Sequence, residues 1–254
     1  MGMEMKELEY VLVPLGLLVF VLYHVWLLYS IHRNPLGTVI GLNAHSRHQW
    51  VLCMMSDPLK NGVLAVQTLR NNIMASTLLG TTAITLSSLI GIFASSTGTG
   101  TSESEGMPMT YTATSIKQIC ITVCFLIAFL CNVQSIRYYA HVSFLITAPT
   151  LGLGDQSEHM EYIAKILNRG SHSWSLGLRA FYLSFPLFLW IYGPIPMFAC
   201  CCFTSISFYF LDTTAKVTRD LHTNSFTKDT PTPHHPHCPY SPLPSPDLPA
   251  DHHV

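Results

Sequence analysis

Long apolar stretches without charged residues alternate along this chain with polar, basic segments. One segment joins the two kinds: a polar run from Lys60 to Asn72 continues, with no helix breaker, into a stretch from Ile73 to Ser102 that lacks Asp, Glu, Lys, Arg and His. At a helical rise of about 1.5 Å per residue, this stretch is long enough to cross the hydrocarbon core of a bilayer. The pattern predicts one long helix that begins in water and ends in lipid.

Four apolar runs predict four transmembrane helices in a membrane domain of residues 1–220, at about residues 10–31, 73–96, 116–139 and 179–211. The last run contains Pro186, Pro194 and Pro196, and Gly193 stands beside the last two. Each half around Gly193 is too short to cross a bilayer alone, so we expect a single Pro-kinked span, with a re-entrant hairpin as the alternative. The expected fold class is an all-α integral membrane protein with the second helix extended into the cytosol.

The segments between the spans are expected to be helical in part. A short helix is predicted at residues 44–55, after which Asp57 and Pro58 provide a good start for the long second helix. An amphipathic helix is predicted at residues 158–168, on the membrane or against the first loop. Residues 221–254 are rich in Pro and His without an apolar pattern, so this tail is predicted to be disordered.

The charge of the loops predicts the orientation in the membrane. The loops after the first and third spans carry four Lys or Arg residues each, whereas the loop after the second span carries none before Lys117. Cytoplasmic loops carry the excess of Lys and Arg, so four spans place these basic loops in the cytosol and both termini outside it. Lys216 and Arg219, which follow the last span, argue against this arrangement.

Composition narrows the functional classes. The chain has 49% hydrophobic and 11% charged residues, compared with roughly 25% charged residues in soluble proteins. A formal net charge of -1 and the lack of a dense basic cluster exclude nucleic acid as a partner. His45 and His48 have helical ligand spacing, but no second pair or carboxylate completes a set, so no metal site and no cofactor are predicted. No catalytic order or phosphate loop is recognisable, which argues against an enzyme.

Basic and amide side chains gather at the predicted cytosolic ends of the spans. Guanidinium groups pair bidentately with phosphates and carboxylates, so an anionic head group or a partner could bind there. The alternative is that these arginines only anchor the helix ends in the interface. The candidate ligand-binding residues are Arg47, Arg70, Asn71, Asn72, Arg137 and Arg179.

A second candidate site lies within the apolar runs. Asn132 is a polar residue near lipid depth, where hydrogen bonding between helices is its usual role. If the broken last helix faces Asn132, the unwound backbone near Pro194 and Pro196 resembles a transporter site, and these three residues form a transport path. No carboxylate lies within a predicted span, which removes the usual relay for protons or cations.

Three blocks of the sequence resemble a known family. In the first, Leu42-Asn43-Ala44 is followed by Arg47 and Trp50-Val51; the second is the run from Lys60 to Ser76; the third leads from Arg179-Ala180-Phe181-Tyr182 to Gly193-Pro194-Ile195-Pro196. Together they are similar to the plant branch of the membrane-protein family catalogued as domain of unknown function 599, over about residues 10–215. The resemblance implies a plant source and an integral membrane protein. It supplies no activity, substrate or catalytic residue.

These observations lead to two functional hypotheses. We favour a non-enzymatic multi-pass protein of the plasma membrane or endomembranes that organises partners or lipids at its basic cytosolic face. Its expected partners are the lipid bilayer and either an anionic lipid or another membrane protein, and the small-residue faces of the second and third spans also suit an oligomer. The alternative is a small-solute transporter or channel that uses the broken last helix.

Overall fold

The structure is a computed structural model that describes residues 2–99, 108–148 and 156–213. Within these ranges the regular secondary structure is helical apart from one isolated β-bridge between Thr38 and Thr213, so the all-α prediction is confirmed. The elements are α1 (Gly2–Arg33), the 3-10 helix η1 (Pro35–Gly37), α2 (Val39–Ser56), α3 (Pro58–Thr99), α4 (Pro108–Thr147), α5 (Gln156–Leu189) and α6 (Pro194–Asp212).

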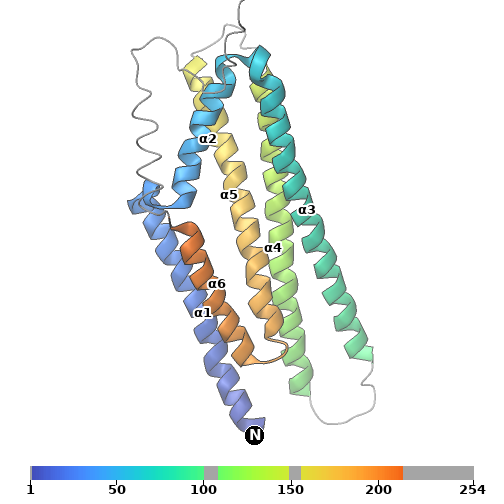
Figure 1. Ribbon diagram of the computed structural model, residues 1–254. Coiled ribbons are helices and arrows are strands. Elements are labelled where there is room, and N and C mark those ends of the chain that lie inside the picture. Colours follow the sequence, from blue (N-terminus) through green and yellow to red (C-terminus); the bar gives the residue numbers. More distant parts are fainter. Residues whose placement is uncertain (1, 100–107, 149–155, 214–254) are drawn as a thin grey trace, which may run out of the picture.

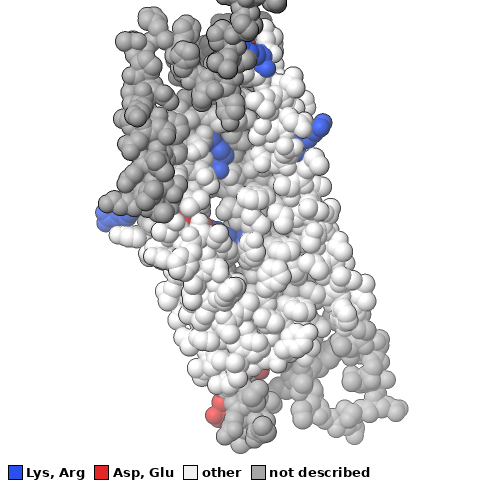
Figure 2. Space-filling model, in the orientation of Figure 1, with Lys and Arg blue, Asp and Glu red and all other residues white. Residues whose placement is uncertain are grey.

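The helices form two parts that lie end to end (Figure 1). α3, α4 and α5 run through both parts, α2 packs beside them in one part, and α1 and α6 pack beside them in the other. On the face shown in Figure 2, Lys and Arg lie mainly in the α2 part, and the surface of the α1–α6 part is almost free of charge until acidic residues at its far end. We call these two parts the basic half and the membrane half, and the far end of the membrane half the acidic end.

Four helices of the described chain are long and apolar enough to cross a bilayer: Glu7–Arg33, Pro58–Phe93, Thr114–Thr147 and Pro194–Asp212. Large apolar side chains such as Leu22, Leu28 and Phe203 are exposed on this half, where lipid takes the place of a protein core. The chain is therefore an integral multi-pass membrane protein. The predicted spans at residues 10–31, 73–96 and 116–139 lie on α1, α3 and α4.

The prediction of a single kinked span at residues 179–211 is wrong. α5 ends at Leu189, the chain reverses, and α6 begins at Pro194 and runs back beside α5 (Figure 1). Gly193 has a φ of 154°, a conformation that L side chains rarely adopt. Pro194 follows at the first helical position, where a missing N–H costs nothing. Pro186, in contrast, is accommodated inside α5.

The reversal changes the topology. α1 and α6 run in the same direction from the acidic end toward the basic half, and the bridge between Thr38 and Thr213 holds the end of α6 beside η1. Gly2 and Asp212 consequently lie at opposite ends of the membrane half, so the expectation that both termini share one side is wrong. The C-terminal half of α5 descends through the membrane half between α4 and α6 (Figure 1), beside the four candidate spans. α6 ends at Asp212 next to the basic half, and Lys216 and Arg219 lie outside the described residues.

Each half has its own core. In the basic half, apolar side chains of four helices pack together, and Val51, Leu69 and Ile163 are fully buried. Burial of one such side chain from water contributes about 1.5–3 kcal/mol. In the membrane half the helices pack through small residues such as Ala83 and Ala128, because close backbone approach stabilises helix contacts in lipid.

The smaller helix predictions are confirmed in position. Residues 44–55 lie on α2, and residues 158–168 form the start of α5, which packs against α2 rather than ending in a separate loop helix. The predicted disordered tail, residues 221–254, lies outside the described residues.

A polar cluster closes the acidic end. The Lys117 Nζ atom lies 2.7 Å from the Glu9 Oε1 atom, and the Trp190 indole donates to the same oxygen at 2.7 Å. Lys117 also donates to the Trp190 carbonyl at 3.3 Å. These contacts tie α1 and α4 to the turn between α5 and α6.

Candidate functional site

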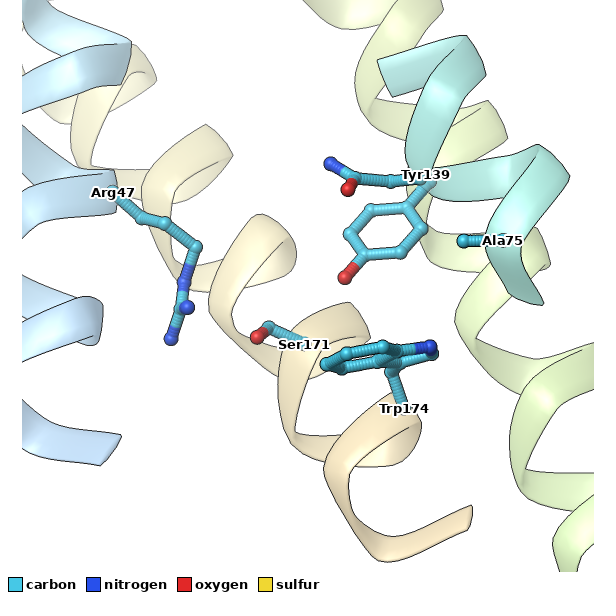
Figure 3. Close-up of a pocket in the computed structure, with 6 residues that line it drawn as sticks. Arg47, Ala75, Tyr139, Ser171 and Trp174 are labelled. Carbon is cyan, nitrogen blue, oxygen red and sulfur yellow. The ribbon is translucent and has the colours of Figure 1, made fainter. Parts of the chain in front are cut away.

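A cavity of about 170 Å³ lies between the helices of the basic half. Figure 3 shows the Arg47 guanidinium on one side, the Tyr139 and Ser171 hydroxyl groups bordering the same space, and the Trp174 ring below it. The lining residues are Arg47 from α2, Asn72 and Ala75 from α3, Tyr139 from α4, and Ser171 and Trp174 from α5. Four consecutive helices, α2 to α5, thus contribute to one space.

Arg47 is positioned by contacts with α5. Its Nε–H donates to Asn168 Oδ1 at 2.8 Å, and the Asn168 amide donates in turn to the Ala44 carbonyl at 3.4 Å. The Nη atoms of Arg47 form no hydrogen bond in the described part of the chain. Burial lowers the pKa of the guanidinium, but an arginine remains protonated in proteins. Arg47 is therefore a half-buried cation whose outer donors are available to a ligand.

A second contact holds α2 against α5 near the same place. His48 Nε2 lies 2.9 Å from Glu161 Oε2, and this hydrogen bond lowers the pKa of the Glu161 carboxyl, with Lys165 adding to the effect. Glu161 is thereby engaged by His48 and Lys165 on the outer surface. It does not line the cavity.

The cavity is rich in hydrogen-bond donors. Arg47, Asn72, Tyr139 and Ser171 all offer N–H or O–H groups, and the described lining residues include no Asp or Glu. The Trp174 Nε1 atom is buried and has no hydrogen-bond partner among the described residues. One cation surrounded by neutral donors is an arrangement that suits an anion such as a phosphate or a carboxylate.

Comparison with known proteins identifies the family but no activity. Residues 11–217 match the family described as "Protein of unknown function, DUF599". The chain belongs to this family. The match extends from α1 through α6 and includes every residue that lines the cavity. No curated protein and no solved structure matches the chain.

The DUF599 fold separates the six ligand-binding residues that the sequence suggested. Arg47 and Asn72 line the cavity. Arg70, Asn71 and Arg137 are exposed and are not among its lining residues. Arg179 belongs to a different cluster in the membrane half. The cavity therefore brings together Arg47 and Asn72 of this set, and a ligand-binding role for the other four residues stays a prediction.

Arg179 joins three helices of the DUF599 domain. Its Nη2 atom donates to Asp212 Oδ2 at 2.6 Å, and the Tyr23 hydroxyl donates to the same carboxylate oxygen. The Arg179 Nη1 and His24 Nε2 atoms are 3.5 Å apart, and the Arg179 guanidinium lies over the Phe208 ring. The two charged side chains are only 13% and 12% exposed. Sequence analysis missed Asp212 because it lies one residue beyond the predicted last span.

The three residues of the predicted transport path are not neighbours. Asn132 packs between α3 and α5, where a Cβ built on Gly80 would lie 3.6 Å from its Cβ. A Cβ built on Gly177 would lie 2.8 Å from the Asn132 amide nitrogen. The break before Pro194 is more than a dozen residues further along α5 from Gly177, or about 20 Å at the helical rise. The broken helix therefore does not face Asn132, and Pro194 and Pro196 lie at the acidic end.

Sequence reasoning also missed Tyr139, Ser171 and Trp174. Each lies on a helix that was predicted, at least in part, but periodicity only shows which face of a helix is apolar. Which face of α5 meets α2, and which faces of α4 and α5 meet each other, depends on contacts between residues far apart in the sequence. No local signal in the sequence could have brought these residues together.

Proposed function

We propose that this DUF599 protein is a non-enzymatic membrane component that binds an anionic lipid through the Arg47 cavity and organises lipids or partner proteins at its basic half. The observation that carries this proposal is the cavity itself, in which a half-buried cation and several neutral donors face a common space. The lining offers no evident general base, nucleophile or paired carboxylates, so binding accounts for these residues better than catalysis does.

The position of the cavity supports a lipid ligand. Asn72 lies two residues from Arg70, and Tyr139 lies two residues from Arg137, at the level where exposed arginines anchor helix ends near the head groups. A phosphate at this depth is close to both the cavity and the basic surface. Anionic head groups commonly bind in basic pockets between transmembrane helices.

The source and compartment are part of the same proposal. The likeness of three sequence blocks to the plant branch of DUF599 supports a plant protein. The uncharged surface of the membrane half supports residence in the plasma membrane or an endomembrane, with the basic half in the cytosol.

Replacing Arg47 tests the proposal. The Arg47→Gln variant should retain at least about ten-fold less phosphatidylglycerol than the native protein, because a charge-assisted hydrogen bond in a half-buried site contributes about 1.5–3 kcal/mol. Lipid retained after exchange into detergent is quantified by mass spectrometry, with phosphatidylcholine as the neutral reference.

The matched control is Arg70→Gln, which removes the same charge from an exposed position outside the cavity. It should leave retention of the anionic lipid nearly unchanged. Equal retention by the native protein and the Arg47 variant would contradict the proposal, and equal loss in both variants would favour a diffuse basic surface.

Solute transport is the second candidate, and one observation favours it. Asn132 is 1% exposed within the membrane half, and its side-chain oxygen has no hydrogen-bond partner among the described residues. A transporter would give solute flux in reconstituted vesicles that falls in an Asn132→Leu variant. A lipid-binding component would give no flux in either protein.

A further inference from the structure

Three buried polar atoms below the Arg47 cavity have no hydrogen-bond partner in the residues that the structure describes. They are the Trp174 Nε1, Ser76 Oγ and Asn132 Oδ1 atoms. Ser76 is 0% and Asn132 is 1% exposed. Unsatisfied polar groups are costly in an apolar interior, and more so at membrane depth where water is scarce.

These atoms lie around one crossing of α3, α4 and α5. Gly80 and Gly177 approach Asn132 from the two neighbouring helices. Ser76 precedes Gly80 by one helical turn, and Trp174 precedes Gly177 by slightly less than one turn. The three side chains therefore belong to one local cluster, which we call the lower polar cluster: Ser76, Asn132 and Trp174.

The lower polar cluster continues directly from the cavity. Trp174 belongs to both, and Ser76 follows the lining residue Ala75. On α4, Asn132 lies two turns, or about 10 Å, below the lining residue Tyr139. Figure 3 shows the nitrogen of the Trp174 ring directed away from Arg47, toward α3 and α4. Polar groups thus extend from Arg47 into the membrane half along the inner faces of three helices.

The donor and acceptor groups of the cluster restrict which ligand group it can bind. The Asn132 Nδ2 atom donates to the Ala128 carbonyl at 2.8 Å, which fixes the amide orientation and leaves Oδ1 as an acceptor. The Trp174 indole can only donate, and the Ser76 hydroxyl can do both. A ligand hydroxyl can accept from Trp174 and donate to Asn132, whereas an ammonium group cannot accept from the indole.

We propose that the Arg47 cavity and the lower polar cluster form one binding site for a polyol phosphate, with the phosphate at Arg47 and a hydroxyl group of the polyol between Trp174 and Asn132. This inference rests on the proposed function and adds the ligand class. The polyol phosphate is either a lipid head group or a free phosphate ester, since both present the same chemistry.

Binding of three soluble probes tests the ligand class. The protein in phosphatidylcholine nanodiscs is titrated calorimetrically with glycerol 3-phosphate, phosphoethanolamine and inorganic phosphate. The native protein should prefer glycerol 3-phosphate to the other two by about ten-fold, as expected for a buried donor–acceptor pair. Asn132→Leu should abolish this preference and leave the affinity for inorganic phosphate unchanged.

Two further variants separate ligand recognition from loss of folding. Gln134→Leu also replaces an amide side chain by leucine, but on another face of α4, and should keep the preference for glycerol 3-phosphate. Ser76→Ala removes only one oxygen atom and should reduce the preference without affecting the size-exclusion profile. Retention of the full preference in both Asn132→Leu and Ser76→Ala would overturn the role of the lower polar cluster.

The remaining outcomes distinguish this inference from the proposed function. If the three probes bind equally well to the native protein, the polyol assignment is overturned but anion binding is retained. If none binds, and phosphatidylglycerol does not bind either, the proposed function fails as well. Replacing part of the phosphatidylcholine by phosphatidylglycerol identifies the source: weaker binding of glycerol 3-phosphate assigns the site to the lipid, and unchanged binding assigns it to the free ester.

Discussion

At the scale of single residues, the Arg179–Asp212 ion pair is a largely buried contact between two helices of the membrane half. It links α5 to α6, and Tyr23 and His24 extend the link to α1. A charge buried near lipid is tolerated only when it is paired, because an isolated charge loses its hydration without compensation. The pair therefore explains how a segment that contains an arginine can pass through this half.

Removing one partner should destabilise the protein more than removing both. Arg179→Leu leaves the Asp212 carboxylate buried without its cation, which should cost about 3–5 kcal/mol. The double variant Arg179→Leu with Asp212→Leu should recover most of this loss. Thermal unfolding in detergent compares the stability of the native protein, the Arg179→Leu variant and the double variant. A double variant that is no more stable than the single one would contradict the role of the pair.

At the scale of elements, α5 connects the two halves. Its first turns pack against α2 in the basic half, and its last turns lie between α4 and α6. Gly170 and Gly177 allow close approach to α4: a Cβ on Gly170 would lie 3.0 Å from the Tyr138 Cβ, and a Cβ on Gly177 3.1 Å from the Cys131 Cβ. Small residues at helix crossings thus set the distance between α4 and α5.

Gly177→Ala should push these two helices apart. The new methyl group would lie 2.8 Å from Asn132 Nδ2 and 3.2 Å from the Ala128 carbonyl oxygen, contacts that the backbone must relieve by moving. We expect a loss of about 1–3 kcal/mol, seen as a lower unfolding temperature. Gly91→Ala in α3 is the control, because its Cβ would meet no described atom within 4 Å, and helix propensity then favours alanine. Equal effects of the two substitutions would refute tight packing at Gly177.

At the scale of the whole molecule, the number of crossings determines on which side each terminus lies. The four candidate spans lie on α1, α3, α4 and α6, and the second half of α5 descends beside them through the membrane half. We predict that this segment of α5 also crosses the bilayer, which places the N-terminus and the end of α6 on opposite sides. The excess of Lys and Arg predicts that the basic half faces the cytosol.

Epitope tags at the two ends test this topology. In sealed cells a tag before Gly2 should be accessible to antibody, whereas a tag after Val254 should become accessible only after permeabilisation. The opposite pattern would reverse the orientation but keep the number of crossings odd. Two tags accessible from the same side would show an even number of crossings and would contradict the prediction that the second half of α5 crosses the bilayer.

The apolar runs alone determined the all-α class and three of the spans, and local helix signals located the helices in the first and third loops. A bilayer leaves the backbone no alternative to a helix, so the length of an uncharged run is a sufficient signal. The alternation of basic and acidic loops could likewise be predicted from the sequence. These properties depend only on residues that are close together in the chain.

Only the tertiary structure decided the reversal after Leu189, the path of α5 between α4 and α6, and the composition of the candidate site. The apolar run in the second half of α5 is too short to predict a separate span, and it begins at a charged residue, Arg179. In the structure Arg179 is paired with Asp212, and α4 and α6 lie on either side of this segment. Arg47 and Trp174 likewise share a cavity because α2 packs on α5. Pairing of charges and convergence of helix faces depend on residues distant in the chain, and periodicity along one helix carries no information about its partners.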